Sequence, residues 1–341
     1  MTHQLFKLKV EEVEIGRPIV EFVNFPSFYG LQKVKAPIYI YRATKEISPC
    51  VVVTACMHGD EINGLRAAQL LMKGKLKLLK GTLIIIPAVN IYGFLNKQRY
   101  LPDRKDLNRC FPGKPKGSFG ARFANFIFKQ ITKYGDVFID LHSGGPGRFN
   151  IPQIRCDLDT EGMLDLVNNI SIPLVVNSTL RDGSLREAIN DLGRPCIVFE
   201  GGEGLRIDET IAKYGVNLVK SILSHYGMIK SKKSFKEEKF IIRKTKWMRA
   251  AKGGLLINKA HHGKIVKEGE VVGELRQLTG ELISRITMEH DGVILGISKS
   301  SVVMAGDALY NIGFLCEDTH EDIDDLQEGE GELSDYFDFE V

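Results

Sequence analysis

The feature that most constrains the fold of this chain is residues 50–61, which read CVVVTACMHGDE. The stretch opens with a short apolar run rich in valine, as is typical of a strand buried on both faces of a parallel sheet. Apolar residues at helical spacing follow directly and predict a helix over residues 61–72. A buried strand that leads into a helix is a unit of α/β sheets, and ligands bind at the turn between the two.

The alternation of apolar runs with helical patterns continues to residue 228 and predicts an α/β sheet. Residues 1–45, which precede it, predict short strands joined by turns. The predicted strands of the sheet are residues 51–55, 82–87, 137–141, 172–177 and 196–199, and the clearest helices are residues 61–72, 119–134 and 207–226.

Several predicted strands end in polar residues that could carry out chemistry. In strand order these residues are His58 with Glu61, Asn90, His142 and Glu200. A parallel sheet brings the carboxyl ends of its strands to one edge, so we expect these side chains to lie together. An imidazole and a carboxylate three residues apart can bind one metal ion, and both are common zinc ligands. A lone H-x-x-E pair is more often an ordinary polar loop, but two histidines and two glutamates at such strand ends favour a metal site.

A long connection over residues 91–117 carries few apolar residues. It contains Arg99 and, further on, the run DLNR at residues 106–109. Loops of this length usually serve a function or are disordered. The charged residues of this connection therefore belong either to a binding site or to an ordinary solvated loop.

After a charged segment at residues 229–240 the periodicity becomes β-like, and an internal repeat appears. Residues 266–275 and 303–312 share the pattern V-x-x-G-[DE]-[AV]-[LV]-x-x-[IL], a Gly-acid turn followed by a strand. Two copies predict a small barrel or sandwich with pseudo-twofold symmetry, and the pattern resembles the biotinyl/lipoyl-like fold. Carrier domains of that kind present a lysine on a hairpin. The corresponding turn at residues 278–280 has none, so we expect neither biotin nor lipoate to be attached.

The formal net charge of +3 hides an asymmetry along the 341-residue chain. From Glu317 onward there are twelve acidic residues and no Lys or Arg, which predicts a solvated or disordered tail. The rest of the chain is basic, with 46 basic against 31 acidic residues. A basic body can attract nucleic acid or a small anion. Because no basic-aromatic motif for nucleic acid is present, we expect a small anionic partner or a role in solubility.

Neither the N-terminus nor any later segment predicts export or membrane insertion. The first ten residues lack an apolar core, and no apolar run approaches 18 residues. The six cysteines show no paired spacing, which predicts reduced and mostly buried thiols. We therefore expect a cytoplasmic protein that does not bind a membrane.

Six motifs follow one another between residues 45 and 225: His58-x-x-Glu61, Asn90-x-x-Gly93, Arg99-Tyr100, Asp106-x-Asn108-Arg109, Asp140-Leu-His142-Ser and Glu200. This series resembles that of the succinylglutamate desuccinylase/aspartoacylase family, which is related to zinc carboxypeptidases. The resemblance implies a carboxypeptidase-like mixed sheet flanked by helices over residues 46–228, preceded by the N-terminal strands. It also implies that residues 229–315 form a β barrel-sandwich domain, as in a prokaryotic branch of the family. The acidic composition then predicts a separate tail at residues 316–341.

The resemblance also implies a role for each matched residue. By it, His58, Glu61 and His142 bind one zinc ion per chain and leave a coordination position open for water. Glu200 is the implied general base and proton shuttle. Arg99 is the implied residue that polarises the scissile carbonyl.

The loop residues that follow are implied to recognise the substrate. Asn108 and Arg109 match the pair that grips its carboxylate, since the arginine fork can donate two parallel hydrogen bonds. Asp106 matches an acid that orients a zinc-bound histidine, with His58 as the expected partner. Three arginines are candidates for a further carboxylate-binding arginine of the family: Arg148, Arg181 and Arg186.

These implied roles predict a zinc-dependent amidohydrolase that removes an acetyl or succinyl group from an N-acyl amino acid or related amine. One alternative is a metallocarboxypeptidase acting on peptides, although residues 46–228 are few for an open peptide groove. The other is a non-catalytic metal-binding interaction protein, although a decayed site would be expected to have lost a ligand or Glu200. The expected partner is a small anionic acyl-amino-acid rather than nucleic acid, and a homo-oligomer is possible.

Overall fold

The computed structural model describes residues 7–28, 34–230 and 239–314. The strands up to residue 242 are β1 (Ile19–Phe25), β2 (Val34–Arg42), β3 (Cys50–Ala55), β4 (Thr82–Ile86), β5 (Val137–His142), β6 (Arg148–Cys156), β7 (Leu174–Asn177), β8 (Cys196–Glu203) and β9 (Phe240–Ile242). The helices are α1 (Asn63–Lys73), α2 (Ile91–Asn96), α3 (Phe119–Thr132), α4 (Met163–Asn168), α5 (Leu185–Asn190) and α6 (Glu209–His225), with 3-10 helices at Val10–Glu12 and Leu107–Arg109. The C-terminal strands are β10 (Thr245–Arg249), β11 (Gly254–Asn258), β12 (Ile265–Val266), β13 (Val271–Arg276), β14 (Leu282–Thr287), β15 (Gly292–Ser298), β16 (Val302–Val303) and β17 (Ala308–Phe314).

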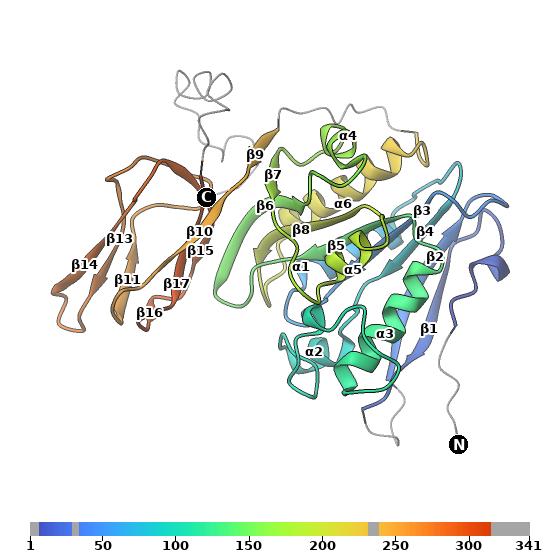
Figure 1. Ribbon diagram of the computed structural model, residues 1–341, viewed down its shortest axis with the longest axis horizontal. Helices are drawn as coiled ribbons and strands as arrows, with labels where there is room; N and C mark the ends of the chain where they lie inside the picture. Colours follow the sequence, from blue (N-terminus) through green and yellow to red (C-terminus); the bar gives the residue numbers. More distant parts are fainter. Residues whose placement is uncertain (1–6, 29–33, 231–238, 315–341) are drawn as a thin grey trace.

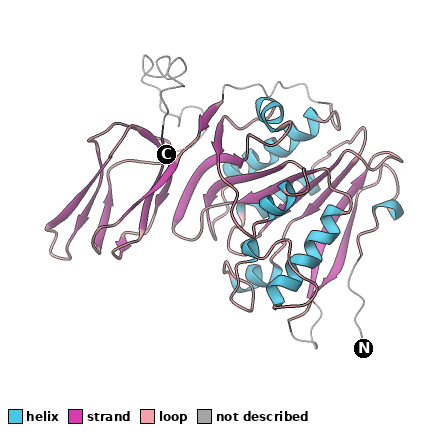
Figure 2. Ribbon diagram, viewed as in Figure 1, coloured by secondary structure: helices cyan, strands magenta, loops and turns pink. Residues whose placement is uncertain are grey.

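One large mixed sheet runs through the molecule in the order β1-β2-β4-β3-β5-β8-β6-β15-β17-β10, with β7, β9 and β12 paired beside this path (Figure 1). Its centre, β4-β3-β5-β8, is parallel throughout. Helices lie on both sides of this centre (Figure 2). The predicted α/β fold with a mixed sheet flanked by helices is therefore confirmed, and the carboxyl ends of four strands share one edge.

The apolar runs form the centre because both of their faces are covered. Successive residues of a strand point to opposite faces of the sheet. Val51 and Val53 accordingly pack in one cluster with residues of α1 and α6, whereas Val52 packs in another with residues of α3. Every residue of β3, β4 and β5 is buried, and full burial of a valine-sized side chain contributes about 1.5–3 kcal/mol.

All of the strands and helices predicted between residues 51 and 226 are present, but some of their predicted ends are wrong. The strands β5 and β8 run through His142 and Glu200, so these two residues lie within strands rather than after them. The extension of β8 occurs because residues 202–203 pair with β6. The connection over residues 91–117 is not wholly irregular, since it contains α2 and a 3-10 helix.

The C-terminal strands divide between two sheets. The strands β14-β13-β11-β16 form a second, smaller sheet, whereas β15, β17 and β10 continue the large one, because β15 pairs with β6. Each copy of the internal repeat gives a short strand, a turn with a positive-φ glycine, and a longer strand. The first copy runs from the large sheet to the small one and the second runs the opposite way. The biotinyl/lipoyl-like classification and the predicted domain boundaries remain predictions.

Two further findings concern the chain as a whole. Within residues 7–28, 34–230 and 239–314, no helix is both long enough and apolar enough to cross a membrane. The cysteines in these residues are all free, and apart from Cys110 they are buried. The predicted burial of most thiols is confirmed there, while Cys316 and the acidic tail lie outside the described residues.

Candidate functional site

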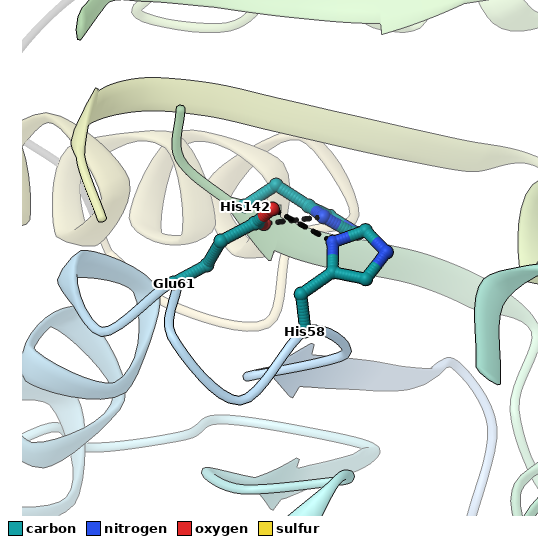
Figure 3. Close-up of side chains that lie close together, drawn as sticks. All are labelled: His58, Glu61 and His142. Atoms are coloured by element: carbon teal, nitrogen blue, oxygen red, sulfur yellow. Dashed lines mark hydrogen bonds and ion pairs between the residues drawn. The ribbon is translucent and has the colours of Figure 1, made fainter. Parts of the chain in front are cut away.

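Three side chains from two adjacent strands converge at the carboxyl edge of the parallel strands (Figure 3). His58 and Glu61 follow β3, and His142 ends β5. One carboxylate oxygen of Glu61 lies 2.7 Å from Nδ1 of His58 and the other lies 2.8 Å from Nδ1 of His142. The potential ligand atoms all lie within 4.8 Å of one another, and all three side chains are buried. The structure thus brings together the three residues that the sequence suggested as metal ligands.

The turn that carries His58 and Glu61 is held by a close backbone approach. A Cβ atom at Gly59 would lie 1.9 Å from the carbonyl carbon of Gly93, so no larger residue fits there. The Sγ atom of Cys56 contacts the carbonyl of Glu61 at 3.4 Å, which ties the two ends of the turn together. These contacts explain why the chain leaves β3 in one fixed direction, toward the edge of the sheet.

A second carboxylate holds the outer nitrogen of each histidine. Nε2 of His58 lies 3.2 Å from Asp106, as the family resemblance implied, and Nε2 of His142 lies 2.7 Å from Asp140. Asp140 also accepts a hydrogen bond from Thr54. Such partners fix the ring orientation of metal-binding histidines. The sequence reasoning assigned Asp140 no role, although its D-x-H spacing within a strand places it on the same face as His142.

The buried acids and imidazoles of this cluster shift one another's pKa values. Burial alone would raise the pKa of Glu61, but the imidazoles of His58 and His142 hold it below its usual range. Burial alone would lower the pKa of His142, but Asp140 and Glu61 raise it well above its usual value. Two inward-facing imidazole nitrogens around one buried carboxylate form a donor set that matches a catalytic divalent-metal site. The residues present therefore fit a metal ion.

Arg99 is directed at the same cluster. Its guanidinium donates to Asp106 through Nε and Nη2, at 3.1 and 2.8 Å. Its Nη1 lies 3.2 Å from Nδ1 of His58 and 3.5 Å from Glu61. The amide of Asn90 donates to the carbonyl of Arg99 and so fixes the loop that carries it. The structure places Arg99 beside the candidate ligands, where an oxygen bound between them could accept its hydrogen bond.

Glu200 lies on the neighbouring strand of the site. It is the register partner of His142 in the β5–β8 pair and borders the same cavity. Burial raises the pKa of Glu200, and the charges of Arg155 and His142 oppose that shift only in part. One of its carboxylate oxygens accepts a hydrogen bond from the side-chain amide of Asn150, at 3.2 Å. A carboxylate near the metal ligands, but not among them, is positioned to exchange protons with a molecule in the cavity.

The two residues suggested for carboxylate binding, Asn108 and Arg109, are only partly buried and exposed, respectively. The side-chain oxygen of Asn108 accepts a hydrogen bond from the backbone of Leu185, which anchors the loop to α5. Arg109 is exposed at the edge of the cavity, where its guanidinium donates to the carbonyl of Asn108. Both line the cavity, so a carboxylate bound by Arg109 would lie at the exposed edge of the cavity and not in its buried part.

The cavity itself measures about 500 Å³ and has a strongly cationic wall. Arg186 is 7% exposed and its guanidinium donates to two neutral oxygens, Ser178 Oγ and Thr179 O. Nε of Arg155 is buried without a hydrogen-bond partner in the described residues. The other basic residues of the wall are Arg99, Arg109, Arg148, Arg181, Arg243 and Lys244. Sequence reasoning missed Arg155, Arg243 and Lys244, because no local pattern links β6 and the segment before β10 to the metal ligands.

Comparison with known proteins identifies the family. The succinylglutamate desuccinylase/aspartoacylase catalytic domain matches residues 48–226. The chain belongs to this family. The match covers all of the residues that the sequence proposed for the site, and it ends where the C-terminal segment begins.

Individual relatives resemble the chain over most of its length. A curated protein of Halomonas elongata, N-alpha-acetyl-L-2,4-diaminobutyric acid deacetylase, is 26% identical over 287 residues, which are 79% of this chain and 83% of that protein. The product-bound ectoine utilization protein EutE (DoeB) of Ruegeria pomeroyi has a TM-score of 0.79 at 21% identity, over 89% of this chain and 96% of that one. A succinylglutamate desuccinylase/aspartoacylase of Rhodobacter sphaeroides gives 0.76 at 22% identity, over 88% and 97%. At these identities the two structures show that the fold is shared.

Proposed function

We propose that this protein is a zinc-dependent amidohydrolase that removes a small acyl group from an N-acyl amino acid. The observation that carries the proposal is the buried cluster of His58, Glu61 and His142 at a cationic cavity that Glu200 also borders. Family membership supports the reaction class, and a relative in Halomonas elongata is named as a deacetylase of an N-acetyl amino acid.

The proposed metal ligands are Nδ1 of His58, Nδ1 of His142 and the carboxylate of Glu61. Two imidazoles and a carboxylate form a common ligand set of catalytic zinc. When bound there, zinc would supply Lewis acidity toward the attacking water and the scissile carbonyl. Asp106 and Asp140 would hold the two imidazoles with Nδ1 facing the metal.

Glu200 is proposed to move the proton in both halves of the reaction. Its carboxylate takes a proton from the attacking water as the new C–O bond forms. The protonated Glu200 gives that proton to the amide nitrogen as the C–N bond breaks, so the products are a carboxylic acid and an amine, and transfer of the acid's proton to the amine gives the carboxylate and the ammonium ion. The raised pKa of Glu200 matches this double use, because a stronger base accepts the proton more readily at neutral pH.

Arg99 is proposed to stabilise the charge that develops on the carbonyl oxygen. Its guanidinium is already oriented by Asp106 through paired hydrogen bonds. A donor held in place before the reaction stabilises the oxyanion without having to reorganise. Arg99 would therefore donate a hydrogen bond to the same oxygen that a metal ion held by His58, Glu61 and His142 would polarise.

The cavity wall supports an anionic substrate. Arg186 is a buried cation whose hydrogen bonds go to the neutral oxygens of Ser178 and Thr179, and it forms no ion pair with the residues that the structure describes. Arg155 contributes a second guanidinium, and Asn108 and Arg109 lie at the edge. Since a buried charge is costly without a counter-ion, a substrate carboxylate is the natural partner.

The cavity volume of about 500 Å³ suits an acyl-amino acid better than a peptide chain, which makes a carboxypeptidase the weaker alternative. The free buried thiols fit a protein of the cytoplasm.

A hydrolysis screen tests this function. Zinc-loaded protein is incubated with a panel of N-acetyl and N-succinyl amino acids, and the released amine is measured. We expect turnover of at least one acidic or neutral member, and none by His142→Ala. A zinc-loaded protein that releases no amine from any member would contradict the proposed reaction.

A further inference from the structure

Asn150, which has no place in the mechanism above, makes the hydrogen bond that orients the proposed general base. It lies on β6, is 8% exposed, and donates from Nδ2 to Oε2 of Glu200 at 3.2 Å. Among the described residues, no other side chain donates a hydrogen bond to this carboxylate. The orientation of Glu200 therefore depends on where the amide of Asn150 points.

The strand geometry around Asn150 is adapted to this contact. Asn150 pairs with Gly202 on β8, whereas three residues later Gln153 pairs with Glu200, so the register shifts between the two positions. The extra residue makes a β-bulge, a feature that often re-aims a side chain beside an active site. The bulge lies between Asn150 and the residue paired with Glu200, which is where the side-chain amide of Asn150 reaches the carboxylate of Glu200.

The C-terminal strands close the other side of the same amide. Asn150 pairs across the β6–β15 junction with Gly296, so glycine stands opposite it on both neighbouring strands. A Cβ atom at Gly296 would lie 2.5 Å from Oδ1 of Asn150, which is shorter than real contacts of that kind. The amide thus occupies the space that a side chain at residue 296 would take.

We propose that Asn150 is a positioning residue for Glu200, and that β15 of the C-terminal strands holds it in place through Gly296. The inference rests on the proposed function only for the role of Glu200 as the base. The amide donor fixes the rotamer of the carboxylate, so that the proton leaves water and reaches the amine along the same path. Through Gly296, the C-terminal strand β15 thereby influences proton transfer by Glu200, although Gly296 itself does not contact the substrate.

The kinetic test uses Asn150→Ala and Asn150→Asp in the zinc-loaded full-length protein. Misplacing a catalytic group by about 1 Å can cost about 100-fold, so we expect kcat to fall by about 10- to 100-fold while KM changes by less than about threefold. Asn150→Asp, which keeps the shape but loses the donor, should be at least as impaired. In a Glu200→Gln background, Asn150→Ala should reduce kcat by no more than about twofold, because residues that act as a unit are not additive. A full additional loss in that background would show a merely structural role and overturn the proposal.

The structural test separates this inference from the proposed function. Crystal structures of the wild type and Gly296→Ala are compared, with Ile297→Val as a control on the same strand. Ile→Val removes one buried methyl group, so this control loosens the packing of β15 without adding an atom beside Asn150. We expect the hydrogen bond from Asn150 to Glu200 to be present in the wild type and in Ile297→Val. It should be broken in Gly296→Ala, and kcat of that variant should fall as in Asn150→Ala.

An intact hydrogen bond in Gly296→Ala, or no such bond in the wild type, would overturn the proposal even if no substrate is found. Turnover by wild type with an unimpaired Asn150→Ala would overturn it while leaving the deacylase function standing.

Discussion

The central parallel strands and the C-terminal strands contribute to the cavity in different ways. The strands β3 and β5 are buried along their whole length, and the residues at their carboxyl ends form the candidate metal site. The strands β11 and β14 are partly exposed, and neither supplies a residue to the cavity wall. The comparison indicates that reactive groups come from the strands with the most rigid surroundings, as precise placement requires.

The C-terminal part nevertheless completes the cavity. Arg243, Lys244 and Trp247 line its wall. Trp247 also stacks under the guanidinium of Arg148, 5.6 Å from its ring, and so joins the two parts of the molecule. The central strands would therefore govern the chemical step, whereas the C-terminal residues would govern which molecules enter and, through Gly296, the orientation of the base.

The largest effect is expected at Glu200 on the central strand β8. Glu200→Gln keeps the size of the side chain but removes the base, so kcat should fall by about 10²–10⁴-fold, the usual contribution of general acid–base catalysis. Zinc content and thermal stability should stay near those of the wild type. Retained turnover in a zinc-loaded Glu200→Gln enzyme would assign the proton transfer to another group.

A smaller effect is expected when the cations of the cavity wall are replaced, and the loss of kcat/KM should be larger for a buried cation than for an exposed one. Losing one partner of a desolvated ion pair costs about 2–5 kcal/mol, so Arg186→Met should lower kcat/KM for a carboxylate substrate by about 30-fold or more. Arg109 is exposed, and exposed pairs contribute about 0–1 kcal/mol, so Arg109→Ala should lower it by less than about tenfold. Carboxamide analogues of the substrate are the control. Equal losses for acid and carboxamide would show that neither arginine binds the carboxylate.

Substitution of the C-terminal cations that line the cavity should act on binding alone. Arg243 and Lys244 are exposed, and salt screens exposed charges. Arg243→Ala and Lys244→Ala should therefore raise KM by less than about fivefold at low salt, with a difference that fades at about 1 M salt. A large loss of kcat in either variant would mean that the division of labour between the two parts is wrong.

We expect that neither biotin nor lipoate is attached to the C-terminal strands. The turn between β13 and β14 contains Leu278 and Gly280 but no lysine. Protein produced in a host that modifies carrier domains should show the unmodified intact mass. A biotinyl or lipoyl adduct within residues 241–315 would make this part a carrier rather than a wall of the active site.

The sequence predicted the features that depend on local pattern. Val51, Val52 and Val53 could be recognised as a buried strand because both faces of the sheet require apolar residues. His58, Glu61 and His142 could be grouped because parallel neighbours end at one edge. Each of these inferences needs only the class of the fold.

The remaining features depend on pairing between distant segments. Asn150 meets Gly296 through the antiparallel β6–β15 junction, and nothing in either local sequence specifies that register. The burial of Arg186 on α5 and the exposure of Arg109 on the 3-10 helix depend on how these elements pack against distant parts of the chain, which spacing alone does not encode. The contact of Asn150 and the difference in burial between Arg186 and Arg109 could therefore be found only in the three-dimensional arrangement.

Zinc titration of the metal-depleted enzyme tests the central claim most directly. Protein treated with a chelator and then dialysed is titrated with zinc, while bound metal and amine release from an N-acyl amino acid are measured together, with His225→Ala as a control away from the site. The account predicts that turnover rises with bound zinc and levels off at about one ion per chain, and that His58→Ala and His142→Ala neither bind the ion nor recover. Full turnover by metal-free protein, or one tightly bound zinc in both histidine variants, would contradict it.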